Sequence, residues 1–160
     1  MASQTEVTVK DTEPMTVAFL SKKGSYTQIN TAFGQRYRWI GQEGYIPSGP
    51  PMGVHFNAPG QVPEEQLLWE LRSPITGKVA TSGPDKDGLG VKQLAAVKVA
   101  TAMHKGPFDT VAKTYEALVC WIMQNGYDIA GPCQEIYFKD PSQTPPKELL
   151  TEVGFPVRKR

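Results

Sequence analysis

The most constraining feature of this chain is an internal repeat. Shifted by 82 positions, residues 9–75 align with residues 91–157 without a gap, and 21 of the 67 aligned pairs are identical. The identities run along the whole repeat and include Lys23-Gly24 with Lys105-Gly106, Trp39-Ile40 with Trp121-Ile122, Gly44-Tyr45 with Gly126-Tyr127, and Gly49-Pro50 with Gly131-Pro132. One copy is too short to bury a stable core alone. The repeat therefore predicts a single domain over residues 1–160, with copies at about 9–75 and 91–157.

Both copies show the same order of predicted elements. The predicted strands cover residues 16–21, 52–57 and 66–75 in the first copy, and residues 97–103, 134–139 and 149–157 in the second. After the first strand of each copy, apolar residues recur at helical spacing, following an N-cap oxygen from Ser25 or Asp109. Each helix is expected to end at Gly44 or Gly126, which suits a left-handed C-terminal cap.

This order predicts an α+β fold made by tandem duplication of a βαββ unit. Because one helix covers only one face of a small sheet, the two units are expected to pair about a pseudo-twofold axis. Their antiparallel sheets, with one helix each, would leave a central ligand groove. Residues 76–90, rich in Gly, Ser and Asp, are expected to form a flexible, exposed linker between the copies.

Composition and charge argue against several classes of partner. The net charge is +1 with acidic and basic residues mixed along the chain, so no basic surface for nucleic acid is expected. Arg158-Lys159-Arg160 is interpreted as a solvated tail. The chain has no signal-peptide pattern and no apolar run near the roughly 18 residues that span a membrane. We therefore expect a soluble, cytoplasmic protein without a nucleic-acid or membrane partner.

The cysteines and histidines give little support to metal or cofactor chemistry. Cys120 and Cys133 lack CxxC spacing and a nearby histidine, so they are interpreted as reduced, partly buried side chains. His55 and His104 are isolated from each other and from acidic clusters, which argues against a zinc site or a catalytic triad. We expect neither a metal nor a cofactor.

The copies differ most sharply where Gly53 of the first is replaced by Glu135 of the second. Alternation along a strand places Glu135 and Tyr137 on one face, and their counterparts are Gly53 and His55. A carboxylate among aromatic rings, opposite the open volume beside a glycine, suits a lipophilic cation. The alternative, an exposed glutamate or one paired with a lysine, stays open.

Other candidates divide between structure and ligand contact. Trp69 is paired with Thr151 and is therefore unique to its copy, which makes it a candidate ligand platform. Trp121 matches Trp39 and is expected to pack in the core rather than to contact a ligand. Glu70 and Glu152 match each other, which favours a structural or solvated role, although Glu70 could add a second acid to the groove.

Taken in order, several motifs resemble the GyrI-like family, also described as the bacterial effector-binding or SOUL-like small-molecule-binding domain. The motifs that carry the resemblance are Lys105-Gly106-Pro107-Phe108, Trp121-Ile122, Asn125-Gly126-Tyr127, Ala130-Gly131-Pro132, Glu135-Ile136-Tyr137, Asp140-Pro141 and Leu149-Leu150-Thr151-Glu152-Val153. The resemblance covers nearly the whole chain and implies two βαββ units with a groove between them.

The family's central glutamate carries over to Glu135. The resemblance also names Tyr137, Trp69, Tyr37 and Trp121 as expected lining of the groove. Many relatives join this domain to a helix-turn-helix module. Only about 15 residues precede the first predicted core strand, so the chain resembles the stand-alone form, which would not bind DNA itself.

Three functions follow from the resemblance. The first is binding of aromatic or lipophilic, cationic small molecules, in a xenobiotic-sequestering or sensing role. The second is a cofactor-independent hydrolase that opens the cyclopropane rings of DNA-alkylating compounds, with Glu135 as general acid or base and Tyr137 as its proton partner. The third is a gyrase-inhibitor-like interaction with protein, for which the sequence offers no exposed acidic run. The natural ligand and the oligomeric state stay open.

Overall fold

The computed structural model describes residues 6–57, 61–77, 79–139 and 143–160. Asp140 and Pro141, one of the motifs above, lie outside this description. The chain divides into two compact units. Unit 1 is formed by Met1–Thr12 and Ala96–Arg160, and unit 2 by Glu13–Ala95.

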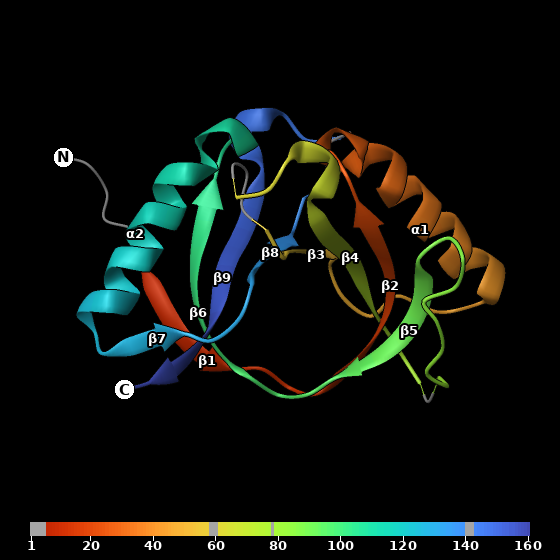
Figure 1. Cartoon of the computed structure of the whole chain (residues 1–160), viewed down its shortest axis with the longest axis horizontal. Coiled ribbons are helices and arrows are strands. Elements are labelled where there is room, and N and C mark those ends of the chain that lie inside the picture. The colour runs from red at the N-terminus through yellow and green to blue at the C-terminus, as the bar shows by residue number, and fades with distance from the viewer. Residues whose placement is uncertain (1–5, 58–60, 78, 140–142) are drawn as a thin grey trace. The chain divides into compact units, whose positions relative to one another are not determined.

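Unit 2 is a four-stranded antiparallel sheet with one helix on one face (Figure 1). Its elements are β2 (Met15–Lys23), α1 (Ile29–Glu43), β3 (Met52–His55), β4 (Leu68–Ile75) and β5 (Leu89–Leu94). The strands lie in the order β3-β4-β2-β5. Leu20, Trp69 and Leu71 alternate onto the face covered by α1 and pack with Ala32 of that helix.

Unit 1 has the same plan (Figure 1). Its elements are β1 (Val7–Asp11), β6 (Lys98–Lys105), α2 (Val111–Gln124), β7 (Tyr127–Ile129), β8 (Cys133–Tyr137) and β9 (Leu150–Lys159). The strands lie in the order β1-β6-β9-β8, and β7 pairs with the end of β9. Ala100, Ala102 and Val153 pack under α2.

The edge strands β1 and β5 are exchanged between the sequence copies. They correspond to each other under the 82-residue shift, yet each pairs with a strand of the other sequence copy. Strand β1 pairs with β6, and β5 pairs with β2. Val9 of β1 lies opposite Ala100 of β6, and Val91 of β5 lies opposite Ala18 of β2. The structural unit therefore runs from β2 to β5, and the last two residues of the predicted linker, Leu89 and Gly90, already belong to β5.

Local signals explain the ends of the helices. Ser25 caps a short 3-10 helix, Tyr26–Gln28, where its hydroxyl accepts from the amide of Thr27 at 3.1 Å, and α1 follows directly. The prediction that Asp109 is an N-cap is wrong, because Asp109 lies inside the 3-10 helix Phe108–Thr110. Gly44 ends α1 at φ 75°, a left-handed conformation that favours glycine.

The predicted α+β class, the antiparallel sheets and one helix per repeat are confirmed. The predicted strands fall on β2, β3, β4, β6, β8 and β9. Strands β1, β5 and β7 were not predicted. The twofold axis and the central groove stay predictions. In the described part of the chain, no helix has the length and apolar character needed to cross a membrane.

The buried stripes of the two helices differ in charge at one position. In unit 1, Leu118 of α2 lies in a single apolar cluster. In unit 2 its counterpart is Arg36, which lies on the buried stripe of α1 between Ala32 in one cluster and Ile40 in another. The Arg36 guanidinium donates to the carbonyl of Arg72 at 3.4 Å, and burial lowers its pKa to about 10.

Candidate functional site

Glu135 lies on the helix-covered face of the sheet of unit 1. In the register of β8 with β9, Glu135 is opposite Val153 and Tyr137 is opposite Thr151. Val153 packs under α2, so Glu135 and Tyr137 share the face on which that helix lies. The predicted alternation along this strand is confirmed. Glu135 is half-buried, and Tyr137 is buried.

Two phenol groups hold the Glu135 carboxylate. The Tyr115 hydroxyl donates to Oε2 at 2.5 Å, and the Tyr137 hydroxyl donates to Oε1 at 2.8 Å. Tyr137 comes from the same strand, whereas Tyr115 comes from α2. Each carboxylate oxygen therefore has its own phenol donor, one from the sheet and one from the helix.

Sequence reasoning missed Tyr115, although the repeat contains a signal for it. The 82-residue shift pairs Tyr115 with Phe33, so the two rings occupy matched helix positions and only the second copy adds a hydroxyl. The added hydroxyl and the added carboxylate occur in the same copy. A search for paired differences between the copies would have linked Tyr115 to Glu135.

The electrostatics of the cluster keep the Tyr115 hydroxyl protonated. Burial raises the pKa of the Tyr115 hydroxyl far above its ordinary value, and the electrostatic interactions and hydrogen bonds with Glu135 and Cys133 raise it further. Tyr115 therefore remains a hydrogen-bond donor. Donors directed at both oxygens of a carboxylate favour its charged form.

Aromatic rings surround this cluster. The Phe108 ring meets the Tyr137 ring edge to face at 5.9 Å, and the Tyr115 ring meets Phe155 in the same way at 5.9 Å. Phe108 remains 39% exposed, so part of this aromatic surface is accessible to solvent. The arrangement places a carboxylate among phenyl rings, which attract cations through their π-faces.

The corresponding place in unit 2 carries an aromatic cluster without the acid. Gly53 and His55 lie on the helix-covered face, opposite Leu71 and Trp69. The His55 ring meets Tyr26 edge to face at 4.9 Å, in the position that Tyr137 and Phe108 occupy in unit 1. The aromatic pair is thus common to both copies, and the carboxylate is specific to unit 1.

The other predicted lining residues make contacts of their own elsewhere in the two units. Trp69 is buried in the core under α1, where its Nε1 donates to the carbonyl of Gly24 at 3.0 Å. Tyr37 projects from α1 and is 70% exposed. Trp121 stacks on Tyr127 at 5.9 Å in unit 1. The structure brings Tyr137 to Glu135, and a ligand role for the other three stays a prediction.

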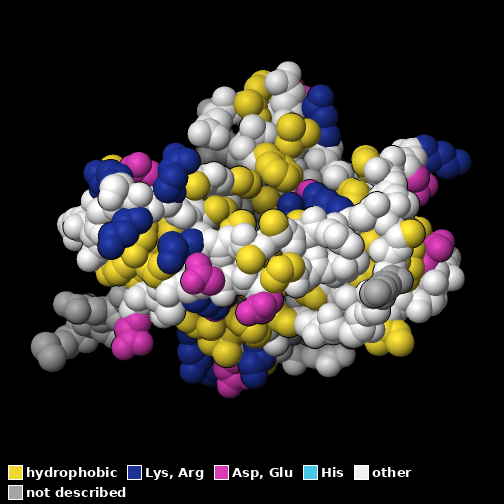
Figure 2. Space-filling model, turned by 90° about the horizontal axis from the view of Figure 1, so that it is seen from below, with side chains coloured by type: hydrophobic (Ala, Val, Ile, Leu, Met, Phe, Trp, Pro, Cys, Tyr) yellow, Lys and Arg dark blue, Asp and Glu magenta, His cyan; other side chains and the backbone are white. Residues whose placement is uncertain are grey.

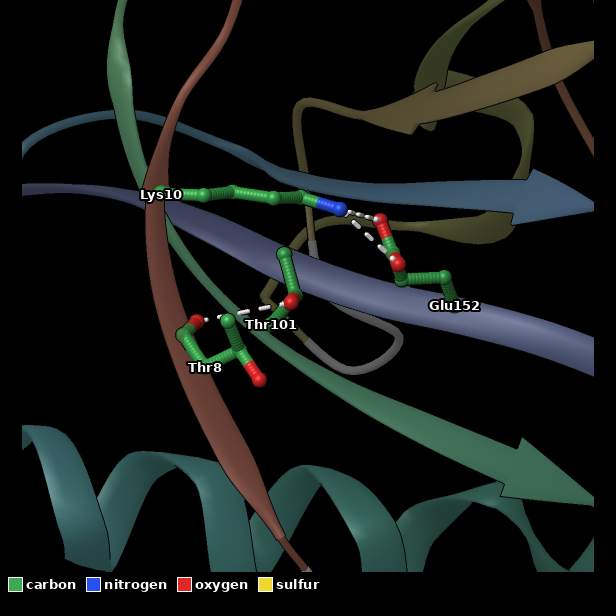
Figure 3. Close-up of polar contacts among 4 residues, drawn as sticks. All are labelled: Thr8, Lys10, Thr101 and Glu152. Carbon is green, nitrogen blue, oxygen red and sulfur yellow. Dashed lines mark hydrogen bonds and ion pairs between the residues drawn. The ribbon is translucent and has the colours of Figure 1, made fainter.

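Glu70 and Glu152 lie on the opposite, helix-free faces of their sheets. Lys10 Nζ lies 2.9 Å from Glu152 Oε1 in unit 1 (Figure 3). In unit 2 the counterpart, Lys92, lies 2.5 Å from Glu70 Oε1. Both glutamates make an equivalent ion pair, which agrees with a structural role in the shared fold.

The described residues form no cluster of metal ligands, and one face of the molecule carries charges of both signs. Among the described residues, no three His, Cys, Asp or Glu side chains form a group that could hold a metal ion. On the face drawn in Figure 2, Lys and Arg side chains are interspersed with Asp and Glu side chains. This face carries no continuous basic surface of the kind that contacts phosphate backbones.

The chain matches the model of the family described as GyrI-like small molecule binding domain over residues 5–158. Comparison with curated proteins gives no match.

Solved structures share the fold at low sequence identity. The C-terminal domain of EcmrR has a TM-score of 0.76 at 19% identity, over 98% of this chain and 99% of that chain. EcmrR in a complex with DNA has a TM-score of 0.82 at 17% identity, over 98% of this chain. This chain spans 58% of the length of that EcmrR chain.

Two further structures carry names that describe an activity or a ligand. A hydrolase from Listeria innocua has a TM-score of 0.71 at 15% identity, over 98% of this chain and 94% of that chain. SAV2435 bound to tetraphenylphosphonium has a TM-score of 0.57 at 15% identity, over 96% of this chain and 94% of that chain. At these low identities, the TM-scores show a likeness of fold alone.

Proposed function

Because the chain belongs to the family of GyrI-like small molecule binding domains, we propose that it binds aromatic, lipophilic cations, with Glu135 as the counter-charge. The binding serves a sequestering or sensing role and needs no cofactor. The observation that carries this proposal is the carboxylate of Glu135 held by the hydroxyls of Tyr115 and Tyr137.

The geometry supports recognition of a cation in two ways. The two phenol donors stabilise the charged form of Glu135, and the rings of Phe108 and Tyr137 offer π-faces and edges next to that carboxylate. A cation that is also lipophilic loses little hydration on entering such a site, so its affinity for the carboxylate is retained. The fold that this chain shares with SAV2435, whose structure contains tetraphenylphosphonium, supports the same class of ligand.

Binding is favoured over hydrolysis by the hydrogen bonds themselves. Donors on both oxygens of Glu135 stabilise its charged form and occupy the positions at which the carboxylate would accept a proton. The raised pKa of Tyr115 makes its hydroxyl a poor proton donor to a leaving group. A hydrolase would need one of these groups to exchange a proton readily. The fold is nevertheless shared with a hydrolase from Listeria innocua, so turnover belongs in the test.

The test compares two probes of matched shape and opposite charge, tetraphenylphosphonium and tetraphenylborate, by calorimetric titration. We expect the wild type to prefer the cation, and Glu135→Gln to reduce that preference at least about tenfold, because it keeps the shape and removes the charge. Glu152→Gln, which removes a carboxylate from the opposite face, is the control and should keep the preference.

Equal affinity of the wild type and Glu135→Gln for tetraphenylphosphonium would refute the cation site. Incubation with a cyclopropane-bearing alkylating compound, followed by chromatography, separates binding from turnover. Recovery of the unchanged compound agrees with a binding protein. Multiple-turnover conversion that depends on Glu135 would establish the hydrolase instead.

A further inference from the structure

A cavity of about 440 Å³ lies at the edge of the sheet of unit 2. It is lined by Phe19 and Ser21 of β2, by Val91 and Lys92 of β5, and by the segment of residues 81–84. Backbone hydrogen bonds of 2.9 and 3.0 Å between Ser82 and Val91 fix that segment against β5. The volume falls in the range of small-molecule sites in proteins.

The charged residues at this cavity do not balance. Lys92 Nζ lies 2.5 Å from Glu70 Oε1, and Arg72 Nε lies 3.3 Å from the same oxygen. Within the described part of the chain, neither cation has another ion pair, so two positive charges share one carboxylate. Glu70 and Arg72 are largely buried, whereas Lys92 is about one-third exposed, at 34%. The excess positive charge therefore faces the cavity through Lys92.

Lys92 also lies against an aromatic wall. Its ammonium group is 4.6 Å from the centre of the Phe19 ring. The carboxylate of Asp85, which follows the lining segment in the chain, accepts from the amides of Asp87 and Leu89 at 2.8 and 2.9 Å. That carboxylate closes the turn before β5. The cavity thus combines one cation, an aromatic ring and the hydroxyls of the serines that line it.

The matching place in unit 1 lacks this imbalance. Lys10 and Glu152 form the same ion pair there, and Figure 3 shows the two side chains meeting across the face of the sheet. The counterpart of Arg72 is Gly154, so unit 1 has one cation for one carboxylate. The counterpart of Phe19 is Thr101, which donates to the carbonyl of Thr8 at 3.4 Å. Both differences remove what a ligand would use.

We propose that this cavity of unit 2 is a second binding site, for a small aromatic monocarboxylate. The carboxylate binds the Lys92 ammonium and supplies the missing negative charge. The aromatic part of the ligand packs against the part of the Phe19 ring that lines the cavity. The site lies in a different unit from Glu135 and selects the opposite sign of charge, so it does not rest on the proposed cation site.

The test uses benzoate, with benzyl alcohol as its neutral analogue, in titrations followed by NMR at low ionic strength. We expect saturable binding of benzoate to the wild type, and binding of benzyl alcohol at least about tenfold weaker. Lys92→Gln should weaken the binding of benzoate at least about tenfold. Lys10→Gln, the matched substitution in unit 1, should leave benzoate affinity unchanged.

A second variant keeps all charges and fills the cavity. Ser21→Met introduces the residue that unit 1 carries at the same position, Met103, so the fold accommodates it. It should weaken the binding of benzoate because the larger side chain fills the cavity, while tetraphenylphosphonium binding stays at the wild-type level. The proposal is overturned if the wild type shows no saturable binding of benzoate, or if folded Lys92→Gln or folded Ser21→Met binds it as tightly as the wild type.

Discussion

The two units show how much one scaffold tolerates at one buried position. At matched places on their helices, unit 1 has Leu118, which is fully buried in one continuous core, and unit 2 has Arg36, which is 5% exposed and separates two apolar clusters. A buried guanidinium is costly unless its surroundings compensate it. In unit 2 the compensation comes from the Arg72 carbonyl and from the Phe33 ring, 5.1 Å from the Arg36 guanidinium carbon. The difference shows that the surroundings of the site, and not the fold, decide whether the charge can be buried.

Exchanging the two residues between the units should give the largest effect. Leu118→Arg places an unpaired charge in a cluster without a compensating group, and it should cost about 4 kcal/mol or more of unfolding free energy. Arg36→Leu removes a buried charge and should leave the stability within about 1 kcal/mol of the wild type or raise it. Urea unfolding of both variants measures this asymmetry. Equal losses would contradict the comparison.

The two glutamates on the helix-free faces should differ by a smaller amount. Glu70→Gln leaves Arg72 and Lys92 without their carboxylate, and it should cost about 2 kcal/mol once the partial exposure of Lys92 is allowed for. Glu152→Gln removes an ion pair with Lys10, which is 44% exposed, and should cost about 0.5 kcal/mol or less. The midpoints of urea unfolding give both values when the dependence of the unfolding free energy on urea concentration is the same in the variants and the wild type. A larger loss of unfolding free energy in Glu152→Gln than in Glu70→Gln would contradict this prediction.

The third contrast concerns the hydroxyl by which Tyr115 differs from Phe33. Because the pKa of Tyr115 is raised in the folded state, its stabilising contribution is complete below the unfolded pKa of about 10 and is lost as the pH rises above that value. The loss should reach about 1.4 kcal/mol at pH 11.

Tyr115→Phe should therefore show a shallower fall in unfolding free energy between pH 9 and pH 11 than the wild type. Tyr37→Phe, at an exposed ring, serves as the control and should keep the wild-type slope. Identical slopes in all three proteins would show that Tyr115 ionises as freely in the folded state as in the unfolded state.

The sequence was informative about the fold because the repeat duplicates every local signal. A helix stripe ending at Gly44 is convincing when the same stripe ends near Gly126, and both helices are present. The missed strands β1 and β5 depend on pairing with a sheet that the alignment assigns to the neighbouring copy. Pairing across copies leaves no local pattern in the sequence, so the repeat boundaries could not reveal it.

The candidate site could be predicted only along the strand. Alternation correctly placed Glu135 and Tyr137 on one face, because the period of a strand is fixed by backbone geometry. Tyr115 comes from a helix, and its contact with Glu135 depends on how that helix packs on the sheet. Trp69 was expected at a ligand, but it follows the alternation of β4 into the core under α1.

The exchange of β1 and β5 also sets the order in which the molecule can be completed during synthesis. Unit 2 is continuous from Glu13 to Ala95, so its strands can pair once those residues have left the ribosome. Strand β1 is made before all of them, yet its partner β6 begins at Lys98, and the sheet is finished only with β9. Unit 1 contains β1, which is synthesised before unit 2, and its sheet is nevertheless completed after the sheet of unit 2.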